Sequence, residues 1–154
     1  NFIRDSAIDK RDETFFRTTR DLVTAARRWR KISNDRLKSV GQNMPRWETL
    51  YLVAYSGEEL TQKELARLIS VTGPTMVHML DTLARDGLIE RRHSALDRRV
   101  TINSITDQRR RVVQDIMGIT NALRSELLSR IDPAKLKVAL EVLGDIRKRL
   151  DEME

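Results

Sequence analysis

The sequence predicts a mainly α-helical protein with one small β-hairpin in its second half. Three observations support this fold class. Apolar residues recur every three or four positions over most of the chain, the spacing of an amphipathic helix. Between residues 60 and 85, two such patterns are short and joined by a tight turn. Two β-prone runs follow, at 88–92 and 100–104, and the polar loop between them indicates a hairpin.

The N-terminal part is predicted to contain two helices separated by a break at 41–43. Residues 2–16 have a mixed pattern that fits either a short helix or an arm. Residues 21–40 have helical apolar spacing and end at the sequence Gly-Gln-Asn. Met44 and Pro45 then open the next helix, because proline suits the first turn, and Ser56-Gly57 ends it.

The first of the two short helices carries a clear start signal. Thr61 is followed three residues later by Glu64, which is the spacing of a capping box. The turn after this helix runs from residue 70 to residue 74. Gly73 is expected to allow its sharp bend, and Pro74 to occupy a first helical position.

The second short helix has an apolar face and a more polar face. We expect the apolar face to comprise Met76, Val77, Leu80, Leu83 and Ala84. We expect the outward face to comprise Thr75, His78, Met79, Thr82 and Arg85. Gly87 follows as a C-cap. Helix, tight turn and helix form the helix-turn-helix arrangement, whose second helix enters the major groove of DNA.

The loop of the predicted hairpin is strongly basic. The chain carries 29 Lys and Arg against 23 Asp and Glu, a net charge of +6, and residues 85–111 alone hold eight Arg and four acids. A hairpin of this kind is the wing of a winged helix, and cations there suit contacts with phosphate. The alternative is an ordinary helical hairpin followed by a solvated Arg-rich loop.

Two helices are predicted after the hairpin. The first covers about 106–130, and Asp132-Pro133 starts the second. Apolar residues in the second alternate by three and four, which is the heptad spacing of helix–helix packing. We expect a dimer surface made of Phe15, Phe16, Leu136, Leu143, Ile146 and Leu150. The alternative is that the last helix packs only on its own domain.

Other classes of function find no support in the sequence. The chain has no cysteine and two histidines, so no metal site, cofactor or thiol chemistry is expected. It carries no nucleophile elbow or glycine-rich phosphate loop, so we expect no enzyme. No apolar run approaches the ~18–20 residues that span a bilayer, and we expect a cytoplasmic protein.

The run from Asp97 to Thr106, DRRVTINSIT, resembles the wing signature of the MarR family of bacterial transcriptional regulators. The segments LTQKELARLI and MLDTLARDGLIERR also resemble the SlyA-like branch of that family. The resemblance covers roughly residues 22–150. One position departs from the pattern, since Arg109 stands where many relatives have glycine.

The resemblance implies a single MarR-type domain over residues 1–154, with a winged helix-turn-helix at about 44–106 and dimerisation helices at about 1–40 and 107–154. It implies a dimeric, sequence-specific regulator, expected to be a repressor, that binds a pseudo-palindromic operator in double-stranded DNA. The predicted DNA-binding residues are Thr61, Gln62, Thr72, Pro74, Thr75, His78, Arg91, Ser94, Asp97, Arg98 and Arg99.

The resemblance also implies a small aromatic or phenolic carboxylate as an effector. The predicted effector-binding residues are Arg27, Trp29, Trp47 and Tyr51. An arginine beside aromatic rings suits a carboxylate on a ring. The alternative, which their spacing favours, is that Trp47 and Tyr51, one turn apart, are ordinary core aromatics. Two rival functions remain open at this point: a winged-helix module that binds another protein, and a helical dimer that binds a small molecule without binding DNA.

Overall fold

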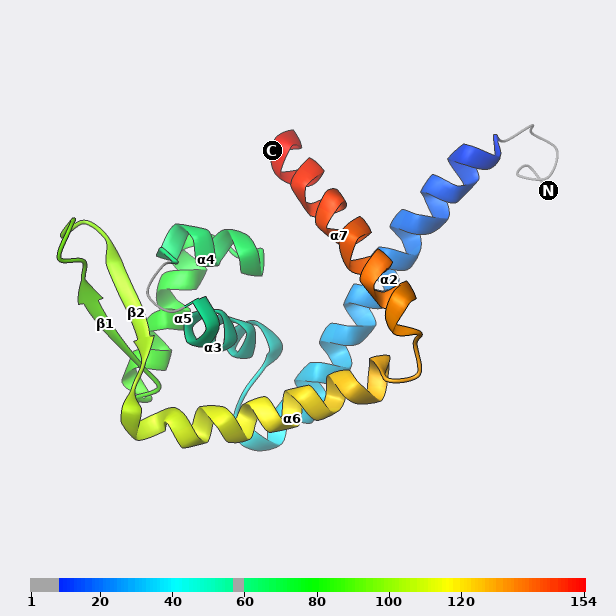
Figure 1. Ribbon diagram of the computed structural model, residues 1–154. Helices are drawn as coiled ribbons and strands as arrows, with labels where there is room; N and C mark the ends of the chain where they lie inside the picture. Colours follow the sequence, from blue (N-terminus) through cyan, green and yellow to red (C-terminus); the bar gives the residue numbers. More distant parts are fainter. Residues whose placement is uncertain (1–8, 57–59) are drawn as a thin grey trace. The chain divides into compact units, whose positions relative to one another are not determined.

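The computed structural model describes residues 9–56 and 60–154. Residues 2–8 of the predicted short helix or arm, and Gly57 of the predicted helix end at Ser56-Gly57, lie outside the described residues. The elements, shown in Figure 1, are α2 (Lys10–Leu37), η1 (Lys38–Val40), α3 (Met44–Ser56), α4 (Gln62–Ile69), α5 (Gly73–Arg85), β1 (Ile89–His93), β2 (Thr101–Ile105), η2 (Asp107–Arg109), α6 (Arg110–Leu128) and α7 (Pro133–Met153). The chain divides into two compact units, one ending at Met117 and the other beginning at Gly118.

The N-terminal helix is longer than predicted. The sequence pattern indicated a helix from Asp21, but α2 begins at Lys10 and has no glycine or proline within it. The carboxylate of Asp9 caps its first turn by accepting the N–H of Arg11 at 3.0 Å. The exposed threonines within the helix do not break it, because their hydroxyls donate to carbonyls of the preceding turn.

The break between α2 and α3 occurs where the sequence predicts it. Gly41 has φ 69°, a left-handed conformation that favours glycine, and its N–H donates to the carbonyl of Lys38 at 3.1 Å. Asn34 Oδ1 then accepts the N–H of Met44 at 2.7 Å, which ties the first residue of α3 to α2. The start of α3 at Met44 confirms the prediction.

The helix-turn-helix has the predicted cap but a different turn. Thr61 and Glu64 form a full capping box: the Thr61 hydroxyl accepts the N–H of Glu64 at 3.2 Å, and the Glu64 carboxylate accepts the N–H of Thr61 at 2.9 Å. The bend itself is made by Ser70, whose φ is 61°. Gly73 is the first residue of α5 and has no positive φ, so its predicted role in the bend was wrong.

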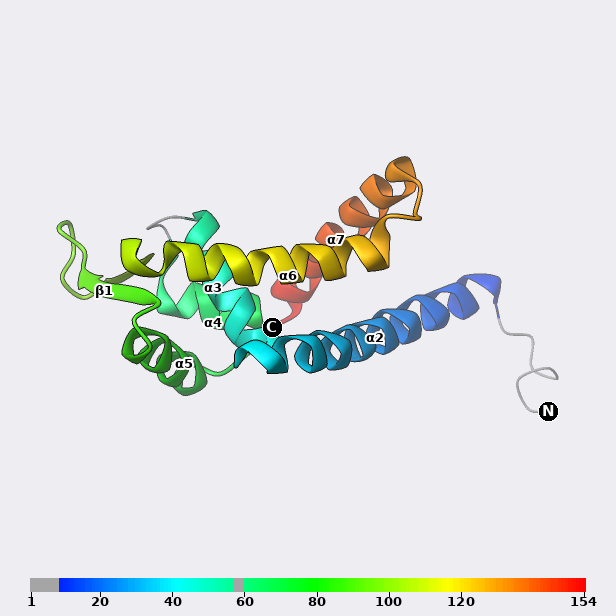
Figure 2. The ribbon, with the colours of Figure 1, turned by 90° about the horizontal axis from the view of Figure 1, so that it is seen from below.

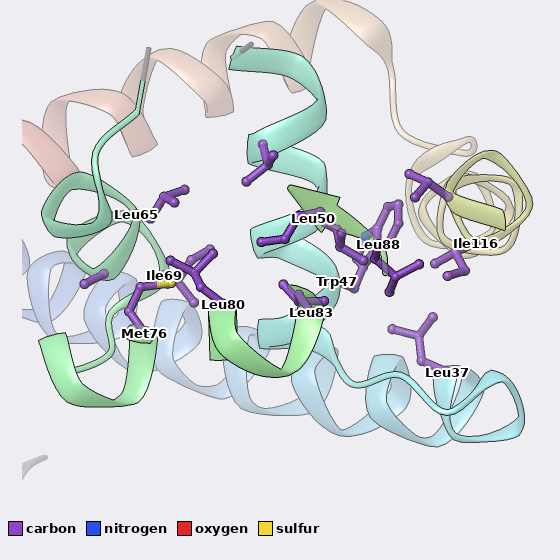
Figure 3. Close-up of a cluster of buried hydrophobic side chains, with 14 residues drawn as sticks. Leu37, Trp47, Leu50, Leu65, Ile69, Met76, Leu80, Leu83, Leu88 and Ile116 are labelled. Carbon is purple, nitrogen blue, oxygen red and sulfur yellow. The ribbon is translucent and has the colours of Figure 1, made fainter. Parts of the chain in front are cut away.

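The core of the first unit is built around α5 and α3, with α4, β1 and the N-terminal half of α6 packed against them (Figure 3). Its most buried large side chains are Leu37, Trp47, Leu50, Leu65, Met76, Leu80 and Leu83. Two predicted positions on α5 are exchanged: Val77 is exposed, while Met79 packs against the core. Leu68, an apolar residue of α4, is also exposed.

The hairpin is an antiparallel pair in which Arg91 faces Asn103, and each strand begins one residue later than predicted. Its base is closed by Thr106, whose hydroxyl donates to the carbonyl of Gly87 at 2.8 Å and whose N–H donates to the carbonyl of Leu88 at 3.3 Å. The loop at the other end projects away from α3, α4 and α5 in both ribbon views (Figures 1 and 2). The predicted wing is therefore present.

The helices after the wing also match the sequence pattern. Thr106 precedes η2, which leads into α6. Asp132 caps α7 by accepting the N–H of Ala134 at 3.0 Å, and Pro133 occupies the first turn as predicted. The α7 helix keeps large exposed apolar side chains, namely Val138, Leu140, Val142, Leu143, Leu150 and Met153. In the part of the chain that the structure describes, no helix is long and apolar enough to cross a membrane.

Replacing Leu80 by Ala should destabilise the protein strongly, because Leu80 is fully buried and its truncation leaves a cavity in the core. We expect the free energy of unfolding to fall by about 2–5 kcal/mol, measured by urea denaturation at fixed protein concentration. The matched control is Leu68→Ala, at a side chain 45% exposed, which should cost less than ~1 kcal/mol. Equal losses for the two variants would contradict the arrangement of the core.

Candidate nucleic-acid interface

The N-terminal end of α5 presents a polar surface made by its own cap. The hydroxyl of Thr72 accepts the N–H of Thr75 at 3.3 Å and donates to the hydroxyl of Thr75 at 2.8 Å. Because Thr75 accepts this bond, its own hydroxyl proton is left to donate to an oxygen such as that of a phosphate. Thr72, Pro74, Thr75 and His78 are all exposed, so the structure brings these four predicted DNA-binding residues together on one helix end.

Two further predicted residues lie at the start of α4. Thr61 and Gln62 are half-buried, and the hydroxyl of Thr61 is occupied by the capping box. Gln62 Oε1 is buried without a hydrogen-bond partner among the described residues. Capping explains why threonine occurs at 61, and contact of either residue with DNA stays a prediction.

The wing loop holds one arginine in a fixed direction. The carboxylate of Asp97 accepts three hydrogen bonds from Arg99: from the backbone N–H at 3.0 Å, from Nε at 3.2 Å and from Nη2 at 3.2 Å. The side chain of Arg99 is nonetheless 91% exposed. Arg98 is exposed and makes no ion pair within the described residues, and Ser94 is half-buried at the start of the loop. The loop thus presents the guanidinium of Arg99 in a fixed direction and that of Arg98 without an ion-pair partner among the described residues.

The hydrogen bonds from Arg99 lower the pKa of the Asp97 carboxyl below its ordinary value. The carboxyl is therefore ionised at neutral pH. Because its pKa is lowered in the folded loop, the clamp on Arg99 is present at neutral pH and is lost only as the pH falls into the acidic range where Asp97 takes up a proton. Ordinary changes in pH near neutrality leave the clamp intact.

Arg91 was predicted to contact DNA, and the structure gives it a second role. Its guanidinium forms an ion pair with Asp81 of α5, and its side chain is mostly covered. This pair links the first strand of the wing to the helix whose outer face carries Thr75 and His78. Arg91 therefore helps to fix the wing relative to α5.

Arg46 performs a similar task, and the sequence did not reveal it. Its Nη1 donates to the hydroxyl of Thr82 at 3.1 Å, its Nη2 pairs with Asp86, and its Nε donates to Gln42 Oε1 at 2.9 Å. These partners join the start of α3 to the C-terminal end of α5. Thr82 and Asp86 follow Arg46 by 36 and 40 positions, so no local spacing marks the contact.

The predicted effector residues do not form one open site in this structure. Trp47 is 1% exposed and belongs to the core, as the core alternative expected, and its contact with an effector stays a prediction. Tyr51 is half-buried between Trp47 and Tyr55, with ring centroids 5.9 Å and 4.3 Å away. On α2, Arg27 is exposed and Trp29 half-buried.

A cavity of about 360 Å³ lies elsewhere in the first unit, where α3, β2 and the start of α6 meet. Its walls are Val53, Ala54, Tyr55, Ser104, Ile105, Arg110, Val113, Gln114 and Met117. This volume is within the range of small-molecule sites, about 300–1,000 Å³. None of the four predicted effector residues lines it. Among the described residues, no group of three or more His, Cys, Asp or Glu is arranged to hold a metal ion.

Four of the six predicted dimerisation residues are exposed within their own unit, and the other two are half-buried. Phe15 and Phe16 are exposed on α2, and each ring lies beneath an arginine, at 5.0 Å from Arg11 and 5.8 Å from Arg20. On α7, Leu143 and Leu150 are exposed, whereas Leu136 and Ile146 are half-buried. Their role in a dimer stays a prediction.

Comparisons with known proteins agree with this geometry. The family model described as "MarR family" matches residues 43–101. The transcriptional regulator PA3341 is 31% identical with a TM-score of 0.77, and the match covers 88% of this chain and 98% of that one. A MarR family transcriptional regulator from Silicibacter pomeroyi is 30% identical with a TM-score of 0.77, covering 85% of this chain and 87% of that one. The regulator BldR from Sulfolobus solfataricus is 26% identical with a TM-score of 0.79, covering 92% and 99%.

The matched region contains α3, α4, α5 and most of the wing, which are the elements that carry the polar helix end and the oriented arginine. Two of the similar proteins are at least 30% identical over most of their own length. The chain therefore belongs to the MarR family of DNA-binding transcriptional regulators.

Proposed function

We propose that the protein is a dimeric repressor that recognises a pseudo-palindromic operator in double-stranded DNA. The α5 helix of each protomer enters a major groove, and the wing reaches the neighbouring minor groove. The two α5 helices lie about one helical turn of DNA apart, roughly 34–36 Å. The SlyA-like assignment within the family stays a prediction.

One observation carries this proposal. The exposed Thr72–Thr75 pair and the Arg99 held by Asp97 belong to two elements that an ion pair, Arg91 with Asp81, links directly. Polar groups for reading bases and a cation for the phosphate-lined groove are thus fixed relative to each other before DNA is bound. A protein-binding module would not need a clamped, fully exposed arginine on its wing.

More distant structures give further support. FabT from Streptococcus pneumoniae, which shares the fold at 19% identity and a TM-score of 0.67, was solved in complex with DNA. CouR from Rhodococcus jostii, at 21% identity and a TM-score of 0.73, was solved with p-coumaroyl-CoA bound. We carry over from them the two binding roles, DNA and a small organic ligand, as parts of the proposal.

For the effector we propose a small aromatic or phenolic carboxylate. Such a ligand needs a cation beside apolar walls. The cavity beside α6 offers Arg110 and Gln114 next to Val113 and Met117. An effector that prefers the form unable to bind DNA shifts the population away from the operator complex. Loss of the protein–duplex complex on titration with such a carboxylate tests this role.

The wing can be tested through Asp97 and Arg99. We expect Arg99→Ala to weaken operator binding by at least ~1 kcal/mol, the lower end for a specific contact. Asp97→Ala removes a negative charge near DNA, so charge alone predicts tighter binding. If the clamp directs Arg99, the same change should instead weaken specific binding, because Arg99 must be ordered on binding. Fluorescence anisotropy with the selected operator duplex measures both variants.

Arg98→Ala is the matched control, because Arg98 carries the same charge without the clamp. It should reduce specific and non-specific binding by similar factors, as expected for a phosphate contact. Unchanged dissociation constants for both Arg98→Ala and Arg99→Ala at physiological salt would contradict the role of the wing.

Thr75→Ala and His78→Ala should alter sequence preference more than salt dependence. The Thr75 methyl and hydroxyl can meet a thymine methyl or a phosphate, and the imidazole of His78 offers a donor and an acceptor to base edges. Selection of duplexes from a randomised pool, with wild type and each variant, measures the preference. If all three proteins select the same consensus, α5 is not the helix that reads the sequence.

Dimerisation is tested by placing charges on α7. Replacing Leu143 and Ile146 by Asp should abolish the dimer, because carboxylates cannot be buried unpaired in an apolar interface. Light scattering should then show monomer or unfolded chain, and operator binding should collapse. Lys137→Asp, at an exposed position of the same helix, lowers the net charge by the same amount and controls for the added charge. A Leu143/Ile146 variant that stays dimeric and binds DNA would place the interface elsewhere.

A further inference from the structure

The wing loop carries an apolar side chain that the proposed function does not yet use. Leu96 is 99% exposed, whereas the next most exposed large apolar residue among those described, Met153, is 67% exposed. Single exposed leucines are common on protein surfaces and need no explanation by themselves. Leu96 differs because it lies in the loop of the wing, directly before the Asp97 that directs Arg99.

The loop itself holds Leu96 outward. The N–H of Leu96 donates to the hydroxyl of Ser94 at 3.2 Å. On either side, the N–H of Ser94 donates to the carbonyl of Val100 at 2.9 Å, and the N–H of Val100 donates to the carbonyl of Asp97 at 3.0 Å. These bonds stabilise the turn that leaves the isobutyl group in water. The conformation is therefore a property of the loop and needs no ligand to form it.

The neighbours of Leu96 determine which surface the side chain can meet. Arg98 and Arg99 follow it within three positions, so an anionic partner is drawn to the same end of the wing. The minor groove of DNA combines phosphate walls with apolar sugar and base surfaces on its floor. Proteins that bind the minor groove frequently insert Leu, Ile, Phe, Met or Pro between base steps and partly unstack them.

We propose that Leu96 is an apolar wedge that enters the minor groove with the wing and partly opens one base step of the operator. This inference rests on the proposed DNA-binding function and adds a determinant of specificity to it. Arg98 and Arg99 supply attraction to the phosphates, and Leu96 supplies contact with the sugars and bases between them. Ser94, through its hydroxyl, acts as a positioning residue for the wedge.

Two properties distinguish a wedge from a charged contact. Burial of an apolar group releases no counterions, so the contribution of Leu96 to affinity should be independent of salt. Opening a base step is easiest at the flexible pyrimidine–purine steps TA and CA/TG. We therefore expect the protein to select such a step where the wing meets the operator. This selection requires no hydrogen bond to a base edge at that position.

The experiment uses the full chain and the duplex that wild type selects from a randomised pool. The variants are Leu96→Ala, Leu96→Asn and Leu96→Met, none of which disturbs the core, because Leu96 is almost fully exposed. We expect Leu96→Ala and Leu96→Asn to weaken binding about tenfold, with an unchanged slope of affinity against salt. Leu96→Met, which keeps an apolar side chain of similar volume, should restore most of the affinity.

The second readout is fluorescence of 2-aminopurine placed in place of an adenine of the step that faces the wing. Wild type and Leu96→Met should increase the fluorescence, because unstacking relieves its quenching, and Leu96→Ala should not. Arg98→Ala is the contrasting variant: it should lower the salt slope by about one while retaining the fluorescence increase in the bound complex.

Equal affinity of wild type and Leu96→Asn for the selected duplex would overturn the proposal. So would a loss of affinity in Leu96→Ala with no fluorescence increase in the wild-type complex, since Leu96 would then touch DNA without opening a step. Either result leaves the DNA-binding function intact. Failure of wild type to select any duplex would instead overturn the proposed function itself.

Discussion

The winged-helix unit depends on the burial of one face of α5. Met76, Leu80 and Leu83 are fully buried against side chains of α3, α4 and β1, and this burial fixes both the rotation and the position of the helix. The opposite face of the same turns carries Thr75 and His78. Because a helix is rigid, packing the apolar face of α5 closely against the core also fixes the direction in which its polar face points.

Polar contacts then fix the end of α5, the wing and the side chain of Arg99, whose positions apolar packing alone does not determine. Arg46 holds the C-terminal end of α5, Arg91 ties the wing to Asp81, and Asp97 orients Arg99. Contacts of this kind, with at least one exposed partner, contribute little to the free energy of folding. Their value lies in geometry, since each joins two elements that must meet DNA together. The surface that meets DNA is thus preorganised by several weak contacts on one strongly packed support.

The sequence predicted the features that rest on local chemistry. The capping box of Thr61 with Glu64, the start of α7 after Asp132 and the C-cap at Gly87 depend on residues a few positions apart, so they can be read directly. The clamp of Asp97 on Arg99 also joins residues only two positions apart.

Features that depend on tertiary packing could not be read in this way. Periodicity placed Val77 inside and Met79 outside, but the adjacent helices cover α5 from a slightly different side. For Trp47 the spacing favoured the core over a ligand cleft, and only the packed structure shows that the ring is fully buried. Arg46 finds its partners 36 and 40 positions along the chain, which no spacing rule reveals. The N-terminal extension of α2 was missed. Threonine, which is frequent in this segment, has a low intrinsic helix propensity because it is β-branched.

The turn at Ser70 has a consequence for how the protein responds to heat. A non-glycine residue in the left-handed conformation costs roughly 1–2 kcal/mol, and here the buried side chains of Ile69 and Met76 on either side hold it in place. The turn is a slightly strained connection whose shape is maintained by its neighbours. Loosening of those neighbours on heating removes the support of the turn. We therefore expect the angle between α4 and α5 to change on heating before the core itself unfolds.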